Sequence, residues 1–566
     1  MATISEAMKI AVQHHQQGEL QEAERIYRQI LQVQPNHADA LHFLGIIGLQ
    51  VGRPDVAVDY ITRAITVNET IPIFHANLGK AWKDQGRLDE AVQCFHQSLR
   101  LKPDHAETHY NLGIALNDEK KLEEAVACYR RAVELKPDYA EAHCNLGSLL
   151  KDQGRLEEAV ISYRRAAELR PNDVQPSYNL GITLRQLGDL DAAEAYCRAA
   201  LERDRQDHEI YSSLGNILAD QGKLEEAVAC HRQALTLKPD YAEGQRNLGI
   251  TWLKMGNFVQ GWNAYEWRLS CEGLSQPPSS SLPIWDGPPL KGRRILLWSE
   301  QGLGDSLQFI RYAPLIQAKG GQVFTHCLPT LAKILATCPG VEQVVTQGEH
   351  LPELDCQISL MSLPRVFGTT LETIPASIPY LHADPELVQY WADTLGSVEG
   401  LKIGITWQGN PGHTNDRNRS FPITMFEPLA NIPGVSLFSL QKGVGTEQLH
   451  ATANHLSITD LGDRLNDMMD TAAVLKNLDL LICPDTAVTH LAGALGVPVW
   501  MALPFASDWR WLMDRQDSPW YSSLRIYRQN QAGDWPSVFT HFAADVCRLA
   551  GLSHFETAGY LSRFIR

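Results

Sequence analysis

Residues 106–139 read AETHYNLGIALNDEKKLEEAVACYRRAVELKPDY, and residues 140–173 read AEAHCNLGSLLKDQGRLEEAVISYRRAAELRPND, so one pattern of 34 residues occurs twice in succession. The pattern continues in both directions. A first set of glycines keeps this spacing: Gly45, Gly79, Gly113, Gly147, Gly181, Gly215 and Gly249. A second set keeps it too, with one lysine among the glycines: Gly18, Gly52, Gly86, Lys120, Gly154, Gly188, Gly222 and Gly256. Self-similarity at a fixed period of this length predicts a repeat protein, in which each repeat is one supersecondary unit.

Each unit predicts two antiparallel helices. A leucine precedes every first-set glycine, as at Leu44 and Leu78, and is expected to pack inward. The small glycine lets the two helices approach closely, the second-set glycine ends the first helix, and prolines such as Pro103 and Pro137 prevent the second helix from continuing. This phasing resembles the tetratricopeptide repeat, and about eight units fit into residues 4–271. The resemblance implies a right-handed superhelix whose concave face binds extended peptides or protein surfaces.

Two kinds of polar side chain also recur every 34 residues. The histidines His75, His109 and His143 occupy a packing position of the repeat, and we favour this interpretation over a ladder of metal ligands. Asparagines stand two residues before five of the first-set glycines: Asn77, Asn111, Asn145, Asn179 and Asn247. They lie on the helix expected to line the concave face, and an amide both donates and accepts hydrogen bonds, as a peptide backbone does. We therefore predict that they bind an extended polypeptide acceptor, beside the alternative that asparagine is common here in repeats with many partners.

Composition and charge limit the classes of function. A chain of 566 residues is too long for one hydrophobic core, so several domains are expected. Fifty basic and 66 acidic side chains give a formal net charge of −16, which is a poor match for nucleic acid or an anionic membrane. No apolar run reaches the roughly 20 residues of a transmembrane helix, and the first residues do not resemble a signal peptide. Eleven scattered cysteines without a C-x-x-C pair predict reduced thiols in a cytoplasmic protein, with no metal site.

The second half of the chain has a different pattern. Residues 272–292 are rich in proline, serine and glycine, and they predict a linker. After it, short apolar strands alternate with helical stretches, from RILLWS through KIGITW to VPVWMAL. This alternation predicts parallel sheets flanked by helices, in one domain at 293–399 and a second at 400–566 that ends in helices.

Ligands of such folds bind at the carboxyl ends of the strands, so three loops are candidate sites. In the loop 300–305, Asp305 follows two glycines at a helix start, where its carboxylate is either a helix cap or a general base. This loop lacks G-x-G-x-x-G, so an ordinary dinucleotide site is not expected. In the loop 408–420, Arg417 and Arg419 indicate an anion site, with a solvated charged loop as the alternative.

The third loop, 484–490, joins a buried strand directly to a helix. The first amides of such a helix and its dipole form a natural binding site for a diphosphate. Thr486 and His490 are four residues apart on one helix face, so both can face the same ligand. The alternative is a capped helix with His490 buried in the core.

Two motifs in this half resemble glycosyltransferase family nine, the heptosyltransferase-type enzymes. They are GDSLQFIRY at 304–312 and PDTAVTHLAGALGVPVW at 484–500, within a likeness that covers roughly residues 293–530. The order of the chain, with tetratricopeptide repeats before this body, also resembles the O-linked N-acetylglucosamine transferases. The predicted fold is therefore an α-helical repeat superhelix followed by an α/β GT-B body of two Rossmann-like domains, the first on the acceptor side and the second binding the nucleotide sugar.

The resemblance also implies roles for single residues. Asp305 matches the catalytic aspartate of the family, and Arg419 matches a basic residue that holds the donor phosphates. Asp485, Thr486 and His490 match the start of the donor-binding helix. Inversion at the anomeric carbon is implied as well.

The sequence thus predicts a glycosyltransferase that moves a sugar from a nucleotide sugar to an acceptor hydroxyl, on a protein or peptide held by the repeats. No D-x-D motif lies in a loop suited to donor binding, so we expect a metal-independent reaction with no cofactor besides the nucleotide sugar. Two alternatives remain open. One is transfer to a saccharide, as heptosyltransferases perform it, and the other is a non-catalytic repeat scaffold with a GT-B body.

Overall fold

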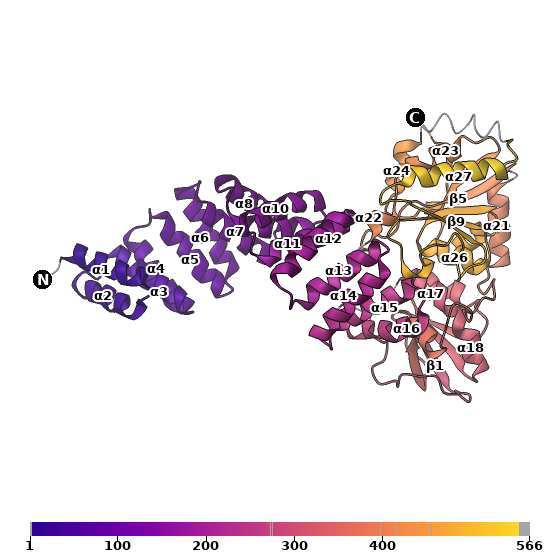
Figure 1. Cartoon of the computed structure of the whole chain (residues 1–566), viewed down its shortest axis with the longest axis horizontal. Helices are drawn as coiled ribbons and strands as arrows, with labels where there is room; N and C mark the ends of the chain where they lie inside the picture. Colours follow the sequence, from indigo (N-terminus) through magenta and orange to yellow (C-terminus); the bar gives the residue numbers. More distant parts are fainter. Residues whose placement is uncertain are drawn as a thin grey trace. The chain divides into compact units, whose positions relative to one another are not determined.

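The computed structural model describes residues 3–271, 273, 276–300, 302–396, 398–413, 415–453 and 456–553. They form a long array of helices followed by an α/β body with parallel sheets, which confirms the predicted fold class (Figure 1). Internal contacts divide the chain into two compact units, Met1–Leu184 and Arg185–Arg566. The division falls inside the repeats, so the last repeats belong to the unit that holds the α/β body. None of the helices described is long and apolar enough to cross a membrane.

The repeats are consecutive pairs of antiparallel helices, and the last helix is the shortest. Their bounds are α1 (Ile4–Gln16), α2 (Leu20–Val33), α3 (Ala38–Gln50), α4 (Pro54–Val67), α5 (Pro72–Asp84), α6 (Leu88–Leu101), α7 (Ala106–Asp118), α8 (Leu122–Leu135), α9 (Ala140–Asp152), α10 (Leu156–Leu169), α11 (Val174–Leu187), α12 (Leu190–Arg203), α13 (His208–Asp220), α14 (Leu224–Leu237), α15 (Ala242–Lys254) and α16 (Phe258–Tyr265). A 3₁₀ turn, η1 (Glu266–Ser270), follows them.

Most first-set glycines lie directly beneath a side chain from the second helix of their own pair. A Cβ atom at Gly79 would be 2.7 Å from the Phe95 ring, and one at Gly113 would be 2.7 Å from the Tyr129 ring. A larger residue would push the two helices apart, and this explains why the glycine recurs. Second-set glycines turn the chain between the helices with positive φ, and Lys120 adopts the same conformation with a φ of 65°.

The recurring histidines connect each pair of helices to the turn before it. His75 Nε2 lies 2.8 Å from the Glu69 backbone oxygen. His109 and His143 make the same contact with the backbone oxygen six residues earlier, at 2.9 and 3.2 Å. These contacts agree with the packing interpretation. Across the described part of the chain, no three histidine, cysteine, aspartate or glutamate side chains are grouped so as to hold a metal ion.

The last repeats and the α/β body form one hydrophobic core. Trp262 of α16 packs edge-on against Trp509, with ring centroids 5.1 Å apart, and its Nε1 donates to the Thr369 backbone oxygen. Trp285 is buried in the same core, although it belongs to the segment 272–292 that the sequence predicts to be a linker. The repeats therefore do not end before the body begins, because α15 and α16 supply part of its interior.

The first sheet has four parallel strands in the order β3-β2-β1-β4. Its strands are β1 (Arg294–Trp298), β2 (Gln322–Cys327), β3 (Val341–Thr346) and β4 (Cys356–Ser359). The helices between them are α17 (Leu303–Phe309), η2 (Ile310–Tyr312), α18 (Ala313–Ala318), η3 (Pro329–Leu331) and α19 (Ala332–Leu335). After β4 follow η4 (Leu360–Ser362) and α20 (Leu363–Val366).

The second sheet has six parallel strands in the order β10-β9-β8-β5-β6-β7. Its strands are β5 (Leu401–Ile405), β6 (Val435–Ser439), β7 (Ile458–Asp460), β8 (Leu480–Pro484), β9 (Val499–Leu503) and β10 (Leu524–Arg528). Its helices are α21 (Pro385–Leu395), α22 (Asp416–Arg419), η5 (Ile423–Phe426), α23 (Glu427–Ala430), α24 (Thr446–Thr452), η6 (Gly462–Arg464), α25 (Met468–Leu475), α26 (Ala487–Leu495), η7 (Trp509–Trp511) and α27 (Trp535–Leu549). In the first sheet the order of the strands reverses between β1 and β4, and in the second sheet it reverses between β5 and β8. Such switch points open a crevice at the carboxyl ends of the strands.

Helix α21, which the sequence assigns to the domain at 293–399, packs on α25 beside the second sheet, where Trp391 Nε1 donates to Asp470 Oδ1 at 3.4 Å. Residues 554–566, at the end of the predicted second domain, lie outside the described residues.

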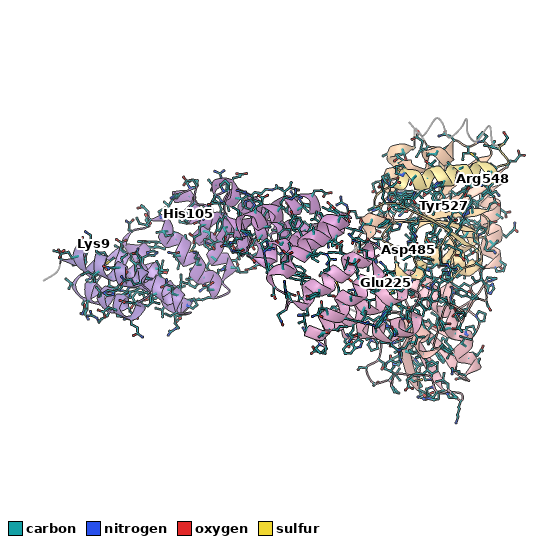
Figure 2. All side chains as sticks on the ribbon, in the orientation of Figure 1. Lys9, His105, Glu225, Asp485, Tyr527 and Arg548 are labelled. Carbon is teal, nitrogen blue, oxygen red and sulfur yellow. The ribbon has the colours of Figure 1, made fainter. Side chains whose placement is uncertain are left out.

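Helix α27 is fixed to the edge strand β10 through one buried carboxylate. Tyr527 OH donates to Asp545 Oδ2 at 2.6 Å, and Arg525 forms an ion pair with the same oxygen at 2.8 Å. Arg548 pairs with the other oxygen of Asp545, and Figure 2 labels Tyr527 and Arg548 on the two elements.

Candidate functional site

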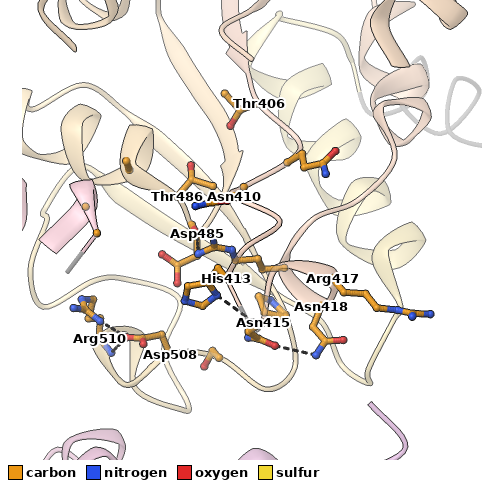
Figure 3. Close-up of a pocket in the computed structure, with 18 of the residues that line it drawn as sticks. Thr406, Asn410, His413, Asn415, Arg417, Asn418, Asp485, Thr486, Asp508 and Arg510 are labelled. Atoms are coloured by element: carbon orange, nitrogen blue, oxygen red, sulfur yellow. Dashed lines mark hydrogen bonds and ion pairs between the residues drawn. The ribbon is translucent and has the colours of Figure 1, made fainter. Parts of the chain in front are cut away.

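The unit Arg185–Arg566 contains a cavity of about 1590 Å³ at the carboxyl ends of both sheets. The loops after β1, β5, β8 and β9 line it, together with the ends of the repeat helices α11, α13 and α15. Figure 3 shows Asn410, His413, Asp485 and Thr486 gathered around one part of this space. All five residues to which the sequence assigns a catalytic or donor-binding role line this cavity: Asp305, Arg419, Asp485, Thr486 and His490.

The junction of β8 and α26 brings a helix N-terminus to the cavity. The strand ends at Pro484 and the helix begins at Ala487, so Asp485 and Thr486 form the turn between them. The Thr486 hydroxyl oxygen is buried and has no hydrogen-bond partner of normal geometry among the described residues. A helix N-terminus with an unpaired hydroxyl beside it is an arrangement that suits a phosphate group.

His490 lies on α26, where its imidazole is buried against aromatic rings. Its Nδ1 is 2.9 Å from the Tyr521 hydroxyl, and its ring stacks on Trp511 with centroids 5.5 Å apart. Burial, supported by the charge of Arg510, lowers the pKa of His490 well below its usual value, so the imidazole is neutral. A Cβ atom at Gly304 would be 2.7 Å from the His490 ring, so this glycine allows α17 to approach α26 closely.

Arg419 ends the short helix α22, where the sequence predicts an irregular polar loop. Its Nη1 donates to the Asp485 backbone oxygen at 3.0 Å, and its Nε donates to Asp416 Oδ1 at 3.1 Å. A Cβ atom at Gly409 would be 2.7 Å from Arg419 Nη2, so the glycine makes room for the guanidinium beside the start of α26. Arg417, from the same helix, extends away from Asp485 in Figure 3. Of this loop, only Thr414 lies outside the described residues.

Asp305 lies in the first turn of α17, and each of its carboxylate oxygens has a partner. Oδ2 accepts a hydrogen bond from Gly302 N at 2.9 Å, which is a helix-capping contact. Oδ1 forms an ion pair with Arg510. The carboxylate therefore caps the helix and also lines the cavity, and its role as a general base stays a prediction. Gln301, in the same loop, lies outside the described residues.

The titratable groups near the start of α26 have shifted pKa values. Burial raises the pKa of Asp485 to about 6, and the charge of Asp508 contributes in the same direction. Burial lowers the pKa of His413, and the charge of Arg419 adds to this effect. Burial thus shifts the pKa of Asp485 upward and that of His413 downward, so both shifts favour the uncharged form of the side chain.

The sequence analysis missed the loop after β9. Residues 504–510 line the cavity, and Arg510 forms the ion pair with Asp305. The rule that ligands bind at the carboxyl ends of parallel strands applies to β9 as well as to β8. In the sequence, a cluster of charged and aromatic residues soon after a strongly apolar strand could have indicated this part of the site: Asp508-Trp509-Arg510-Trp511.

The predicted acceptor-binding asparagines are in the repeats and do not line the cavity. Four of them belong to the unit Met1–Leu184, and Asn247 belongs to the other unit. Asn145 Nδ2 donates to the Tyr110 hydroxyl at 3.2 Å, and Asn247 Nδ2 donates to Ser212 Oγ at 3.1 Å. Asn77 also contacts the side chain 35 positions earlier. These three amides therefore connect consecutive repeats.

Comparison with protein families covers both halves of the chain. Tetratricopeptide repeat families match residues 11–69, 79–118, 115–154, 144–208 and 215–256. Glycosyltransferase family 9 (heptosyltransferase) matches residues 411–502. This match contains Arg419 and the start of α26 but not Asp305, so it is narrower than the resemblance that the sequence motifs suggest.

The chain is also similar to a curated protein and to several solved structures. Protein FlbA of Caulobacter vibrioides is 29% identical over 308 residues, which are 50% of this chain and 51% of FlbA. The chain thus spans about half the length of this curated relative. Among solved structures, YrrB, described as a TPR protein with an unusual peptide-binding site, is 23% identical and covers 32% of this chain and 95% of its own, with a TM-score of 0.31. Pseudomonas aeruginosa PilF is 20% identical and covers 37% of this chain and 95% of its own, with a TM-score of 0.33. On the evidence of the family matches, the chain joins tetratricopeptide repeats to a glycosyltransferase family 9 domain.

Proposed function

We propose that this protein transfers a sugar from a nucleotide sugar to a hydroxyl group of a protein or peptide that the repeats hold, as in the O-linked N-acetylglucosamine transferases that it resembles. One observation carries the proposal: Asp305, Arg419 and the N-terminus of α26 line the same cavity. The cavity of about 1590 Å³ is larger than the 300–1,000 Å³ usual for one small ligand, so a donor and an acceptor segment fit together.

The donor diphosphate would lie at the N-terminus of α26. There the first amides and the helix dipole favour an anion, and the unpaired Thr486 hydroxyl can donate to a phosphate oxygen. Arg419 is already fixed beside this position through its bond to the Asp485 backbone oxygen. His490 contributes a hydrogen-bonding group and not a charge, since burial keeps it neutral.

The reaction needs a base and stabilisation of the leaving group. Asp305 accepts the proton of the acceptor hydroxyl while the oxygen attacks the anomeric carbon. The bond between that carbon and the phosphate oxygen breaks, the nucleoside diphosphate leaves from the opposite face, and the configuration inverts. Arg419 and the helix N-terminus stabilise the charge on the departing diphosphate, so the mechanism requires no metal ion.

The acceptor would reach this centre along the repeats, in the cytoplasm. Arg185, Asp220 and Lys254 stand at or near the ends of three successive first helices of the repeats, and all three line the cavity. Asp220 pairs with Arg185 at 2.7 Å and with Lys254 at 3.3 Å. A polypeptide on the concave face of the last repeats would therefore contact these three charged side chains, which line the same cavity as Asp305.

Donor use is tested with a panel of nucleotide sugars that covers the common bases and sugars. We expect one of them to release nucleoside diphosphate in the presence of the full chain, and release to fall with Asp305→Asn. If no donor is turned over and calorimetry detects no nucleoside diphosphate binding, the chain is a scaffold without transferase activity.

The acceptor is tested with the triple variant Asn111→Ala, Asn145→Ala, Asn179→Ala. Sugar incorporation into protein should be lost, and background release of nucleoside diphosphate should continue, because the cavity is unchanged. Circular dichroism is needed as a control, since Asn145 also connects two repeats. Equal incorporation by the triple variant and the parent would favour the saccharide acceptor of a heptosyltransferase-like enzyme.

A further inference from the structure

We infer that Arg510 positions the carboxylate of Asp305, so that the base has its full set of contacts only when the loop after β9 meets helix α17. The inference rests on the proposed function, in which Asp305 is the base. It adds a positioning residue that lies outside the segment matching the glycosyltransferase family.

Three hydrogen bonds hold the plane of the Arg510 guanidinium. Its Nε donates to Gln308 Oε1 at 2.7 Å, its Nη1 donates to Asp508 Oδ1 at 2.9 Å, and its Nη2 pairs with Asp305 Oδ1. The guanidinium carbon also lies 4.3 Å from the ring centroid of Trp509. The side chain is only 9% exposed, so the surrounding groups leave the guanidinium one orientation.

These partners come from two different sheets. Asp305 and Gln308 belong to α17, which follows β1 of the first sheet. Arg510 and Asp508 follow β9 of the second sheet, and they line the cavity together with Asp305. Asp305 therefore has its full set of contacts only while the loop after β9 stays beside helix α17.

The charges around Asp305 explain why it needs an arginine. Burial raises the pKa of the Asp305 carboxyl, and the charge of Asp508 raises it further. Arg510 opposes both effects, with smaller help from Gly302 N and His413. The His490 ring, which packs beside Gly304 of the same turn, is neutral and adds no charge. A protonated carboxyl group cannot take the acceptor proton, so the charge of Arg510 favours the ionised form that the reaction needs.

The pH dependence of turnover tests the inference on the full chain. The probe is the nucleotide sugar that releases nucleoside diphosphate fastest in the panel, and kcat and KM are measured across the acidic range. With Arg510→Gln, the acidic limb of the pH profile of kcat should move to higher pH by about 1–3 units. A nearby opposite charge lowers the pKa of a carboxyl group by this amount, and the variant loses that charge. With Asp508→Asn, the limb should move to lower pH. KM for the donor should change little in either variant.

A conservative variant separates charge from geometry. Arg510→Lys keeps the charge but cannot make three fixed hydrogen bonds, so its acidic limb should stay near that of the parent while kcat falls about tenfold or more. Arg515→Gln is the matched control, because Arg515 is a half-buried arginine of the same region that pairs with Asp517 and does not line the cavity. Its profile should equal that of the parent.

Each result decides the inference. If Arg510→Gln is folded and active with an unshifted limb, Arg510 does not set the state of Asp305, while the proposed function stands. If Arg510→Gln does not fold, Arg510→Lys decides, and parental kcat in that variant refutes the positioning role. If the parent releases no nucleoside diphosphate from any donor, the proposed function fails and the inference fails with it.

Discussion

Lys120 occupies a second-set position where every other repeat has glycine, and its φ of 65° is unfavourable for a residue with a Cβ atom. We expect Lys120→Gly to stabilise the repeats by about 0.5–1 kcal/mol, since relief of the left-handed conformation outweighs the greater entropy of glycine in the unfolded chain. Urea unfolding followed by circular dichroism measures the change. Gly154→Ala, with a φ of 74°, is the matched control and should destabilise; a loss of stability in Lys120→Gly would contradict the explanation.

His231 on α14 makes the stability of the repeats depend on pH. Its ring is fully buried, neither ring nitrogen has a hydrogen-bond partner among the described residues, and burial lowers its pKa to about 3. Because the folded value lies below the unfolded value of 6.5, its contribution is full above pH 6.5 and is lost as the pH falls toward 3. The slope is about 1.4 kcal/mol per pH unit, so the parent should lose about 2 kcal/mol between pH 7 and 5 from this residue.

The variant His231→Phe tests this dependence, because Phe95 occupies the corresponding position of an earlier repeat. Its free energy of unfolding should be higher than that of the parent at pH 5, and the difference should shrink at pH 7. Chemical denaturation at both pH values gives the two numbers. Parallel pH profiles for parent and variant would show that another group controls the acid sensitivity.

Asp305→Asn should separate catalysis from donor binding. The amide keeps the size of the side chain but cannot accept the acceptor proton, so transfer should fall by roughly 10² or more. Affinity for nucleoside diphosphate should stay nearly constant, because Asp305 contacts Gly302 and Arg510 and not the start of α26. Turnover and calorimetry on the same preparation provide both readouts. Near-normal turnover would leave Asp305 with the role of a helix cap alone.

At the scale of elements, the strand-to-helix junctions are the parts that the sequence predicts well. The junction of β8 and α26 places Thr486 and His490 on one cavity, and its residues are neighbours in sequence, so a local motif describes them completely. The three strands that sequence analysis missed, β4, β7 and β10, are each at the edge of a sheet. An edge strand pairs on one side only, so its sequence needs less apolar character than a central strand such as β8.

The same junction predicts weaker phosphate binding in Arg419→Ala and His490→Ala. We expect each variant to lose about 1–3 kcal/mol of nucleoside diphosphate affinity, because Arg419 supplies a charged hydrogen bond and His490, on helix α26 itself, supplies a hydrogen-bonding group. Isothermal titration calorimetry measures the loss, with Arg515→Ala as a control outside the cavity. Unchanged affinity in both variants would mean that the donor binds elsewhere.

At the scale of the whole molecule, the last repeats share a hydrophobic core with the α/β body. A chain of residues 185–566 should fold cooperatively, whereas residues 272–566 alone should not, because the shorter chain loses Phe258 and Trp262 from the common core. Loss of one buried aromatic side chain costs about 3–5 kcal/mol, so two are comparable with the whole stability of a domain. Thermal unfolding of the two fragments tests this prediction.

A point variant gives the same test without truncation. Trp262→Ala should destabilise the unit Arg185–Arg566 strongly, and Trp267→Ala should have little effect, because Trp267 is 39% exposed. If both tryptophan variants unfold at the same temperature as the parent, the last repeats do not stabilise the body.

The sequence by itself determines the period of 34 residues, the pairing of helices within each repeat and the three loops at the strand ends. These features depend on residues that are close in sequence: Gly113 and Tyr129 pack together within one repeat, and Thr486 and His490 share one helix. Short-range packing leaves a regular pattern in the sequence, and such a pattern can be read without coordinates.

Only the tertiary structure decides which distant residues meet. Arg510 pairs with Asp305 across 205 positions, and Trp262 donates to the Thr369 backbone oxygen across 107. Neither contact follows from a repeating spacing, because each depends on how two sheets and the last repeats pack around a common core. The candidate residues were therefore predictable one loop at a time, whereas the partner that holds the Asp305 carboxylate was not.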